Sequence, residues 1–452
     1  MKLRYSFRPL VIGLLGLVLP LEASTGAQAK YVRSADSHSF TVFMKEGGWC
    51  WFQDPRAIVQ DGKLVLGALR GNDSGAASVG VFDLGQMKSV GSTVLHDAFN
   101  RDDHNVPVFY QRPDGSLLAM YARHSKDFRH HYRISKPNNP IEWGEERIFE
   151  HDYPTAGKVT YMNLLPLADE GKLYNFYRGI EFNPCFVTST DDGETWSNPT
   201  HFIKSELEGR HRPYVRYVGN GTDTIHFSFT DGHPRNFSNS VYFAAFRKGK
   251  FYRSDGSLIK DLKADGPLRP SEADRVFQGG KGGDPGGPVH EDQRGWTSSI
   301  ELDADGHPHI GYSVHLTNED HRYRLASWNG KRWIDREVAR AGHCLYERES
   351  SYTGLITLDP GDPSTVVIST NVDPTSGKDS GARHEIHRAT IGADDDIGSI
   401  EWKAVTKDSP VRNLRPVIVR GNGYRVITWL RGDFRTYTDY QMDVVGVVEK
   451  LK

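Results

Sequence analysis

The sequence is short of cysteine, of net charge and of long hydrophobic runs, and each shortage excludes a class of protein. Three cysteines in 452 residues cannot form a disulfide framework, so a packed core must stabilise the fold. A formal net charge of −2 provides no basic field, and we expect no nucleic-acid partner. After residue 30 no stretch approaches ~18 apolar residues, so we expect no membrane span in the mature chain.

Turn-forming and aromatic residues are abundant instead. The chain has 46 Gly and 23 Pro, with 11% aromatic and 37% hydrophobic residues. Amphipathic helical periodicity is scarce, while Tyr, Phe, Trp, Val and Ile recur between glycine-containing turns. This composition excludes a disordered chain and favours an all-β protein. The 19 histidines are a high count for a nearly neutral chain.

The first 29 residues are predicted to be a signal peptide. Arg4 and Arg8 form a basic start, residues 9–21 are mainly apolar, and Ala27 and Ala29 give the small-x-small pattern of a cleavage site. The alternative is a buried N-terminal helix. We expect a secreted or periplasmic protein whose residues 30–452 form one domain. Cys50, Cys185 and Cys344 then leave an odd thiol in an oxidising compartment, so at least one is predicted to be buried and free or to bind a metal.

A strand, a turn containing Gly and a second strand recur along the chain. The seven copies cover residues 56–70, 106–124, 161–178, 214–231, 298–315, 352–371 and 415–431. Weaker hairpins lie between them, at 185–197 for example, and a long insertion separates 231 from 298. Four strands per repeat, seven times, predict a seven-bladed β-propeller with four antiparallel strands per blade. A β-helix would have much shorter coils, and a sandwich would not repeat seven times.

One weaker hairpin contains a known structural turn. Residues 189–196 read S-T-D-D-G-E-T-W, which matches the Asp box of sialidase-like propellers. The Ser189 and Asp191 side chains are expected to bond the backbone of the turn, with Trp196 packed between strands. We interpret this motif as architecture and assign it no catalytic role.

Polar and aromatic side chains are predicted to gather on one face of the propeller. In a blade, the first strand begins and the second ends on the same face. The residues at these positions include Gln53, Arg56, His104, Asn105, His124, Tyr161, Arg178, Arg212, Tyr214, His233, Arg235, His315, Arg348, Tyr352, Arg415 and Arg431. Arginine forks bind carboxylate or sulfate, and aromatic rings stack on sugars, so an acidic polysaccharide is the expected partner.

Four of these residues suggest a reaction. His104, His124, Tyr161 and Arg178 come from neighbouring blades two and three, so they can converge on one groove. They suit β-elimination on a uronic acid, in which Arg178 would neutralise the carboxylate and stabilise the enolate. His104 and Tyr161 would share the base and acid roles, in an order that the sequence leaves open, while His124 orients His104 or holds substrate.

Two other function classes remain open at this stage. A glycoside hydrolase would need two positioned carboxylates, and no obvious pair stands out on this face. A sialidase-like enzyme would use a tyrosine nucleophile, for which Tyr161 or Tyr352 is available. A sugar-binding propeller without catalysis would tend to repeat one pocket in every blade, whereas this face differs from blade to blade.

Several motifs together resemble a known family. The sequence GWCWFQDPRA at 48–57, DDHNVP at 102–107, YARH at 121–124, RPYVRY at 212–217 and TDGHPR at 230–235 resemble the seven-bladed ulvan lyases. These are polysaccharide lyases with BNR-like repeats, related to rhamnose–glucuronate lyases. The resemblance covers most of the mature chain. It implies cleavage of rhamnose-3-sulfate–glucuronate linkages by β-elimination, with an unsaturated uronyl end as product. Related hydrolases look to rely on a His near Gln53, where this chain has Phe52, and this favours a lyase.

The resemblance also implies roles for individual residues. His104 and Tyr161 would be the acid–base pair and Arg178 the neutralising group, with His124 near the substrate. Further substrate contacts would come from Asn105, Tyr214, Arg235 and Arg348. The chemistry would need no cofactor, and we expect a monomer.

The resemblance further implies a structural metal ion, zinc or calcium. His233 and Cys344 are its candidate ligands, but their spacing matches no compact metal motif. Cleavage by exo-acting rhamnose–glucuronate lyases or hydrolases remains an alternative to ulvan cleavage.

Overall fold

The computed structural model describes residues 40–72, 74–151, 158–207, 212–280, 293–379, 381 and 383–451. The chain divides into two units, residues 1–35 and 36–452. The first unit, and with it the predicted signal peptide, lies outside the described residues. No helix within the described ranges is long and apolar enough to cross a membrane.

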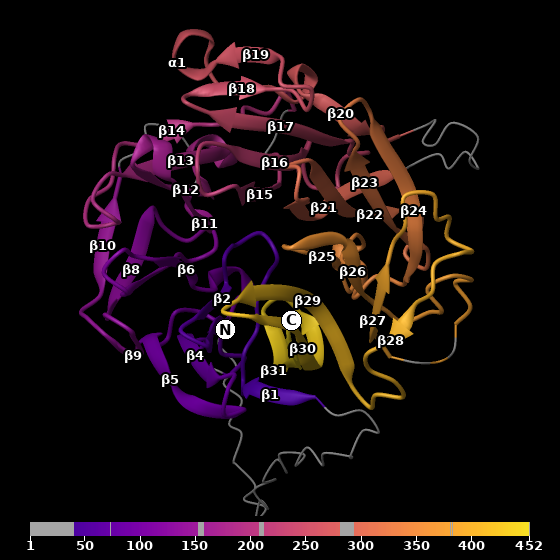
Figure 1. Cartoon of the computed structure of the whole chain (residues 1–452), viewed down its shortest axis with the longest axis horizontal. Helices are drawn as coiled ribbons and strands as arrows, with labels where there is room; N and C mark the ends of the chain where they lie inside the picture. The colour runs from indigo at the N-terminus through magenta and orange to yellow at the C-terminus, as the bar shows by residue number, and fades with distance from the viewer. Residues whose placement is uncertain are drawn as a thin grey trace, which may run out of the picture. The chain divides into compact units, whose positions relative to one another are not determined.

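Seven antiparallel sheets surround a central axis, as the repeat predicts (Figure 1). Blade one consists of β2 (Ala57–Gln60), β3 (Lys63–Leu69), β4 (Ala77–Asp83) and β5 (Lys88–His96). Blade two consists of β6 (Val108–Gln111), β7 (Leu117–Tyr121), β8 (Arg129–Lys136), β9 (Asn139–Trp143) and β10 (Arg147–Glu150). Blade three consists of β11 (Thr160–Leu167), β12 (Lys172–Arg178), β13 (Pro184–Ser189) and β14 (Thr200–His201).

The long insertion extends blade four. This blade consists of β15 (Val215–Gly219), β16 (Ile225–Thr230), β17 (Val241–Arg247), β18 (Lys250–Tyr252), β19 (Leu258–Asp261) and β20 (Asp274–Phe277). A short helix, α1 (Leu262–Asp265), follows β19. The glycine-rich run that begins at Lys281 falls outside the described residues.

The last three blades have four strands each. Blade five consists of β21 (Arg294–Leu302), β22 (Pro308–His315), β23 (His321–Trp328) and β24 (Trp333–Gly342). Blade six consists of β25 (Ile356–Asp359), β26 (Asp362–Thr370), β27 (Glu385–Thr390) and β28 (Lys403–Ala404). Blade seven consists of β29 (Arg412–Gly421), β30 (Tyr424–Thr436), β31 (Asp439–Lys450) and, from the start of the described chain, β1 (Thr41–Met44).

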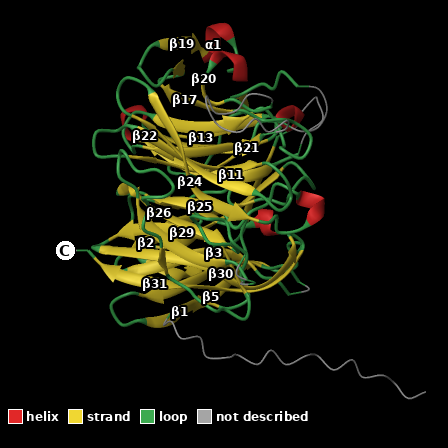
Figure 2. Cartoon of the chain, turned by 90° about the vertical axis from the view of Figure 1, so that its right-hand side faces the viewer, coloured by secondary structure: helices red, strands yellow, loops and turns green. Residues whose placement is uncertain are grey.

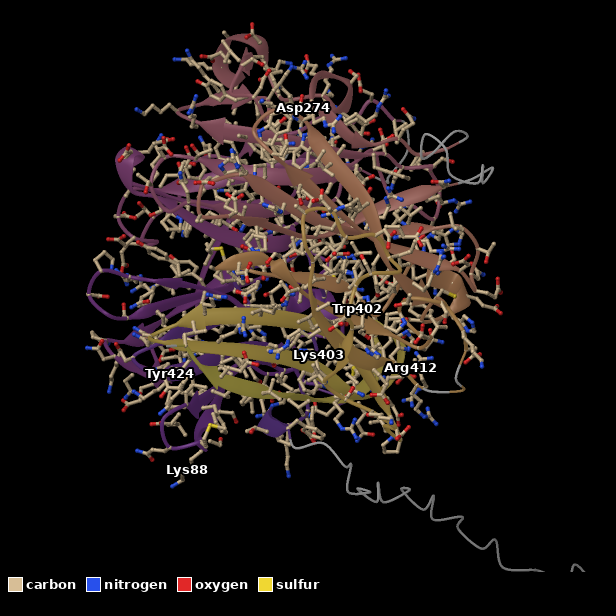
Figure 3. The ribbon with its side chains drawn as sticks, turned by 45° about the vertical axis from the view of Figure 1, so that its right-hand side comes forward. Lys88, Asp274, Trp402, Lys403, Arg412 and Tyr424 are labelled. Atoms are coloured by element: carbon tan, nitrogen blue, oxygen red, sulfur yellow. The ribbon has the colours of Figure 1, made fainter. Side chains whose placement is uncertain are left out.

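Blade seven closes the propeller. Its outer strand β1 pairs with β31, so residues from both ends of the described chain share one sheet. The sheets dominate the structure, and helical segments are few and short (Figure 2). The single-turn 3-10 segments are η1 (Asp103–Asn105), η2 (Ala168–Glu170), η3 (Ile180–Phe182), η4 (Pro270–Glu272) and η5 (Glu347–Glu349). Side chains cover the sheets, and Lys88 of β5 and Asp274 of β20 lie far apart (Figure 3).

The centre of the propeller is filled by residues 47–54, which we call the plug segment. The Trp49 indole donates to the Arg415 carbonyl in blade seven at 3.2 Å, and the Trp51 indole donates to the Thr297 carbonyl in blade five at 3.3 Å. Trp49, Trp51 and Phe52 are buried. The plug segment therefore replaces an open channel with a packed aromatic core.

The Asp box is structural, as expected. The Asp191 carboxylate accepts from the Thr195 backbone N–H at 2.9 Å, and Ser189 Oγ accepts from the Gly193 N–H at 2.8 Å. Trp196 stacks on Phe149 of blade two, with ring centroids 5.5 Å apart. The turn thus joins blades three and two. The cysteines are free, and Cys50 and Cys185 are buried, which confirms the expectation of a buried free thiol.

Candidate active site

A pocket of about 550 Å³ opens on the face where the polar residues were predicted to gather. Its walls come from blades two, three, four, six and seven. The lining residues are His104, His124, Ser125, Phe128, Lys158, Tyr161, Arg178, Phe182, Tyr214, His233, Arg235, Glu349, Tyr352 and Tyr437. A pocket of this volume is in the usual range for small-ligand sites. The four predicted catalytic residues all lie in it.

His104 and His124 are held as a pair by one carboxylate. Their rings stack with centroids 4.2 Å apart and planes 19° apart. Asp102 lies behind them, with one oxygen 2.7 Å from His104 Nδ1 and the other 2.9 Å from His124 Nδ1. Asp102 also accepts from the His104 backbone N–H at 3.1 Å, as the cap of η1. Because both Nδ1 atoms face Asp102, the Nε2 atoms are the ring nitrogens left for chemistry in the pocket.

Electrostatics separate the two imidazoles. Burial and, next, the neighbouring His104 lower the pKa of His124 to about 4, although Asp102 opposes the shift. Burial also opposes charge on His104, but Cys50, Tyr161, Asp102 and Asp103 outweigh it and raise its pKa well above the ordinary value. The pKa of Asp102 lies well below its usual range because the two imidazoles outweigh the cost of burial. In the cluster of Asp102, His104 and His124, His104 therefore carries an extra proton and a positive charge, while His124 is neutral.

Tyr161 is presented to the pocket by a β-bulge. Thr160 pairs with Arg178 and Asn163 with Phe176, so β11 carries one more residue than β12 over this interval. Tyr161 has φ +65°, a left-handed conformation that is unusual for an aromatic residue. The Asn163 side chain holds the bulge by donating to the carbonyls of Tyr161 at 2.8 Å and Phe52 at 3.0 Å.

The hydroxyl of Tyr161 remains protonated at neutral pH. Burial raises its pKa well above the ordinary value, and Tyr214 adds to the shift, against the opposing effects of His104 and Arg178. A phenol of this kind can donate a proton, and it becomes a base only when an added charge nearby stabilises the phenolate.

Arg178, at the end of β12, lies across the ring of Tyr161. Its guanidinium carbon is 4.8 Å from the ring centroid. The guanidinium donates to Ser125 Oγ at 2.8 Å and to the Tyr214 hydroxyl at 3.2 Å. These contacts fix the cation beside Tyr161 without pairing it to a carboxylate among the interactions of the described residues. Arg178 is therefore available to an anionic ligand group.

Another wall of the pocket contains a carboxylate, Glu349, that is already paired with a cationic side chain. Arg235 makes a short ion pair with Glu349 Oε1, and His233 Nε2 lies 3.4 Å from Glu349 Oε2. Burial raises the pKa of Glu349, and Arg235 counteracts this shift. Glu349 is the only carboxylate among the lining residues in the described ranges, so these residues provide no pair of acids for hydrolysis.

The structure separates the predicted substrate residues into two groups. Tyr214 and Arg235 line the pocket. Arg348 is exposed on η5 and is not among the lining residues. Asn105 is fully buried; its side-chain Oδ1 accepts from the His124 backbone N–H at 2.6 Å and its Nδ2 donates to the Asn100 carbonyl at 2.9 Å. Asn105 thus supports the wall behind the pocket.

Two predicted rim arginines are also inside the protein. Arg415 is fully buried and pairs with Asp103 and the Trp49 carbonyl of the plug segment. Arg56 pairs with Asp54 at 2.9 Å and is 4% exposed. The expectation that these two arginines bind ligand on the rim was wrong, because the plug segment covers them. The rim is therefore less cationic than the sequence suggested.

The structure does not bring the predicted metal ligands together. Among the described residues, neither His233 nor Cys344 belongs to a group of three or more His, Cys, Asp or Glu side chains with ligand atoms within 4.8 Å. His233 instead contacts Glu349, and the Cys344 backbone N–H donates to the Asn318 carbonyl at 2.7 Å. This pair does not fit a structural zinc or calcium site.

Sequence reasoning missed several contributors to the site, among them Asp102, Glu349 and Tyr437. Asp102 was passed over although it directly precedes Asp103 and His104, and its position as a cap before an imidazole was the available signal. Glu349 comes from the connection between blades five and six, and Tyr437 from the turn between β30 and β31 of blade seven, and neither carries a motif. Tyr437 packs edge-on against His104 with centroids 5.0 Å apart.

The fold is similar to that of solved polysaccharide lyases. One is described as an ulvan lyase bound to -[GlcA(1-4)Rha3S]-, with a TM-score of 0.63 and 15% identity over 91% of this chain and 95% of that chain. Another is the polysaccharide lyase Uly1, with a TM-score of 0.54 and 12% identity over 88% of this chain and 90% of that chain. These likenesses show the shared seven-bladed fold.

Sequence comparison places the chain in a family. No curated protein sequence matches it. Residues 67–341, more than half of the chain, match the model of the BNR repeat-containing family member. This match includes blades two to four, which carry His104, His124, Tyr161 and Arg178. The chain belongs to the BNR repeat-containing family.

Proposed function

We propose that the protein is a polysaccharide lyase that cleaves a uronic-acid linkage by β-elimination. The observation that carries the proposal is a fixed cation, Arg178, which pairs with no carboxylate of the described residues. It lies beside a protonated phenol and a histidine pair that keeps one neutral imidazole. Elimination needs these three functions: a cation for the carboxylate, an acid and a base. They lie within one pocket.

In the proposed reaction Arg178 binds the substrate carboxylate and stabilises the enolate that forms at C5. His124, the neutral imidazole of the His104–His124 pair, removes the hydrogen from C5. The electron pair forms the C4–C5 double bond, the C4–O4 bond breaks, and the Tyr161 hydroxyl protonates the departing oxygen. Asp102 holds both imidazoles in the tautomer that directs Nε2 to the pocket.

A sulfated rhamnose–glucuronate polysaccharide such as ulvan is the proposed substrate. Lys158 and Arg235 line the pocket in addition to Arg178, and these cations suit a second anionic group beside the carboxylate. The aromatic rings of Tyr214, Tyr352 and Tyr437 provide faces for sugars. The structural likeness to an ulvan lyase bound to -[GlcA(1-4)Rha3S]- supports this choice. We also propose that the enzyme acts outside the cytoplasm, after removal of the predicted signal peptide.

The test is digestion of ulvan and of unsulfated glucuronans by the purified protein. We expect new absorbance at about 235 nm from the unsaturated uronyl end, in step with new reducing ends. Tyr161→Phe and Arg178→Ala are expected to lower kcat/KM by about 10²–10⁴-fold. Tyr110→Phe should not change it, because the Tyr110 hydroxyl donates to Asp192 of the Asp box and does not line the pocket. Reducing ends without absorbance would contradict the proposal and indicate hydrolysis.

A further inference from the structure

A second cluster of chemically active side chains lies behind the pocket, between blades one and two. It consists of His96 at the end of β5, His131 in β8 and Glu146 just before β10, whose ligand atoms lie within 4.8 Å of one another. His96 Nδ1 is 2.8 Å from Glu146 Oε1, and His131 Nδ1 is 3.4 Å from Glu146 Oε2. None of the three lines the pocket.

His131 is the observation that points to a ligand. Its side chain is 3% exposed, yet neither ring nitrogen makes a hydrogen bond. Its Nδ1 faces Glu146 at a distance too long for a good hydrogen bond. Phe99 packs perpendicular to it at 5.0 Å and Tyr121 stacks on it at 5.9 Å. A buried imidazole that packs between aromatic rings and makes no hydrogen bond needs an explanation, and a bound ion is one of the ordinary explanations.

The chemistry of the three groups favours zinc. Two imidazoles and one carboxylate are a common zinc set, and a fourth position can be filled by water. His96 is 24% exposed, so solvent can reach the cluster from its side.

We propose that His96, His131 and Glu146 bind one structural zinc ion that joins blades one and two. Tetrahedral coordination needs ligand atoms about 3.3 Å apart, and only small side-chain shifts separate the present spacing from that value. The Tyr121 hydroxyl, which donates to Glu146 at 2.8 Å, supports the carboxylate from behind.

The position of the cluster indicates which segments the ion would stabilise. The chain runs six residues from His96 to Asp102, and His124 lies between Tyr121 and His131. The ion would therefore fasten both loops that carry the histidine pair and its carboxylate. It is distinct from the predicted His233 and Cys344 ligands, and it does not depend on the reaction proposed above.

The test is the metal content of the full-length protein purified without chelator. We expect about one zinc per chain in the wild type, in Cys344→Ser and in His307→Ala, the last from a separate cluster of Asp303, Asp305 and His307. His96→Ala, chosen because His96 is part-exposed, and Glu146→Gln are expected to bind zinc at least ~10-fold more weakly.

A second readout separates loss of metal from misfolding. After chelation, added Zn²⁺ should raise the Tm of the wild type and of the two controls but not of His96→Ala. The proposal is overturned if the wild type carries no zinc and its Tm ignores Zn²⁺, if His96→Ala keeps the ion, or if Cys344→Ser loses it instead.

Discussion

Asp102 is the residue on which the pocket most depends. A single carboxylate bonds the Nδ1 atoms of His104 and His124 and caps the turn that carries His104. It therefore sets the tautomers of both imidazoles and the proton that they share. Removing its charge leaves the two rings stacked at 4.2 Å without their common anion.

We predict that Asp102→Asn lowers kcat on a uronate polysaccharide by about 10²–10⁴-fold, with a smaller change in KM. The physical reason is that an amide cannot hold the imidazolium, so the pKa of His104 falls and the tautomers are no longer fixed. Kinetics together with NMR titration of the imidazoles measure both effects. Asp305→Asn, on an exposed turn, is the control, and equal kinetics for the two variants would contradict the assigned role.

The sequence predicted some residues of the pocket correctly and misplaced others. Blade position and residue type predicted that His104, His124, Tyr161 and Arg178 would meet, and the structure brings them into one pocket. Asn105 and Arg415 fell at equivalent strand ends but do not line the pocket. The sequence could not distinguish them, because which of these side chains reaches the pocket depends on contacts between distant parts of the chain, such as that of Arg415 with Asp103.

Among the strands, the inner strands of blades three and seven have the same backbone irregularity. Each has a β-bulge with a left-handed residue, Tyr161 at φ +65° in β11 and Arg415 at φ +54° in β29. In β11 the bulge directs a phenol into the pocket. In β29 it directs a guanidinium to Asp103, beside the histidine pair. Such strain costs about 1–3 kcal/mol per residue and persists where contacts over-determine it. Neither residue type predicts a bulge, so both bulges could be found only in the structure.

We predict that Arg415→Met lowers the free energy of unfolding by about 3–5 kcal/mol, because it removes the guanidinium that pairs with the buried Asp103 carboxylate. Urea unfolding followed by tryptophan fluorescence measures the change, since Trp49 and Trp51 pack around this site. The comparison is Arg435→Gln, which removes an exposed pair with Asp439 and is expected to cost at most ~1 kcal/mol. Similar losses for both variants would disprove the account of the buried pair.

For the molecule as a whole, the sequence predicted the blades better than their closure. All seven inner hairpins are present where the repeat placed them, because a period-two pattern and Gly turns are local signals. The pairing of β1 with β31 and the filling of the centre by residues 47–54 were not predicted. Both join segments hundreds of residues apart, for which a single sequence carries no local signal.

Buried neutral histidines make the whole fold sensitive to acid. Burial lowers the pKa values of His226, His321 and His387 to about 4 and that of His384 to about 3. The unfolded chain, with pKa near ~6.5, binds more protons below that pH, so stability is present above ~6.5 and lost as pH falls. We predict a Tm that declines steadily between about pH 6.5 and 4.

Calorimetry across this range measures the decline. His384→Gln is expected to make the slope of Tm against pH shallower, and the same change at part-exposed His307 should leave the slope as it is. A Tm that stays level down to pH ~4 would show that the buried histidines do not control acid stability.

The central claim is that the pocket breaks a uronate linkage without water. The most direct measurement is mass spectrometry of ulvan fragments released in water enriched in heavy oxygen. The account predicts fragments whose new non-reducing uronyl ends are lighter by one water than hydrolysis products, with no heavy oxygen added by bond cleavage. Fragments of hydrolytic mass that carry heavy oxygen at the new reducing end would contradict it.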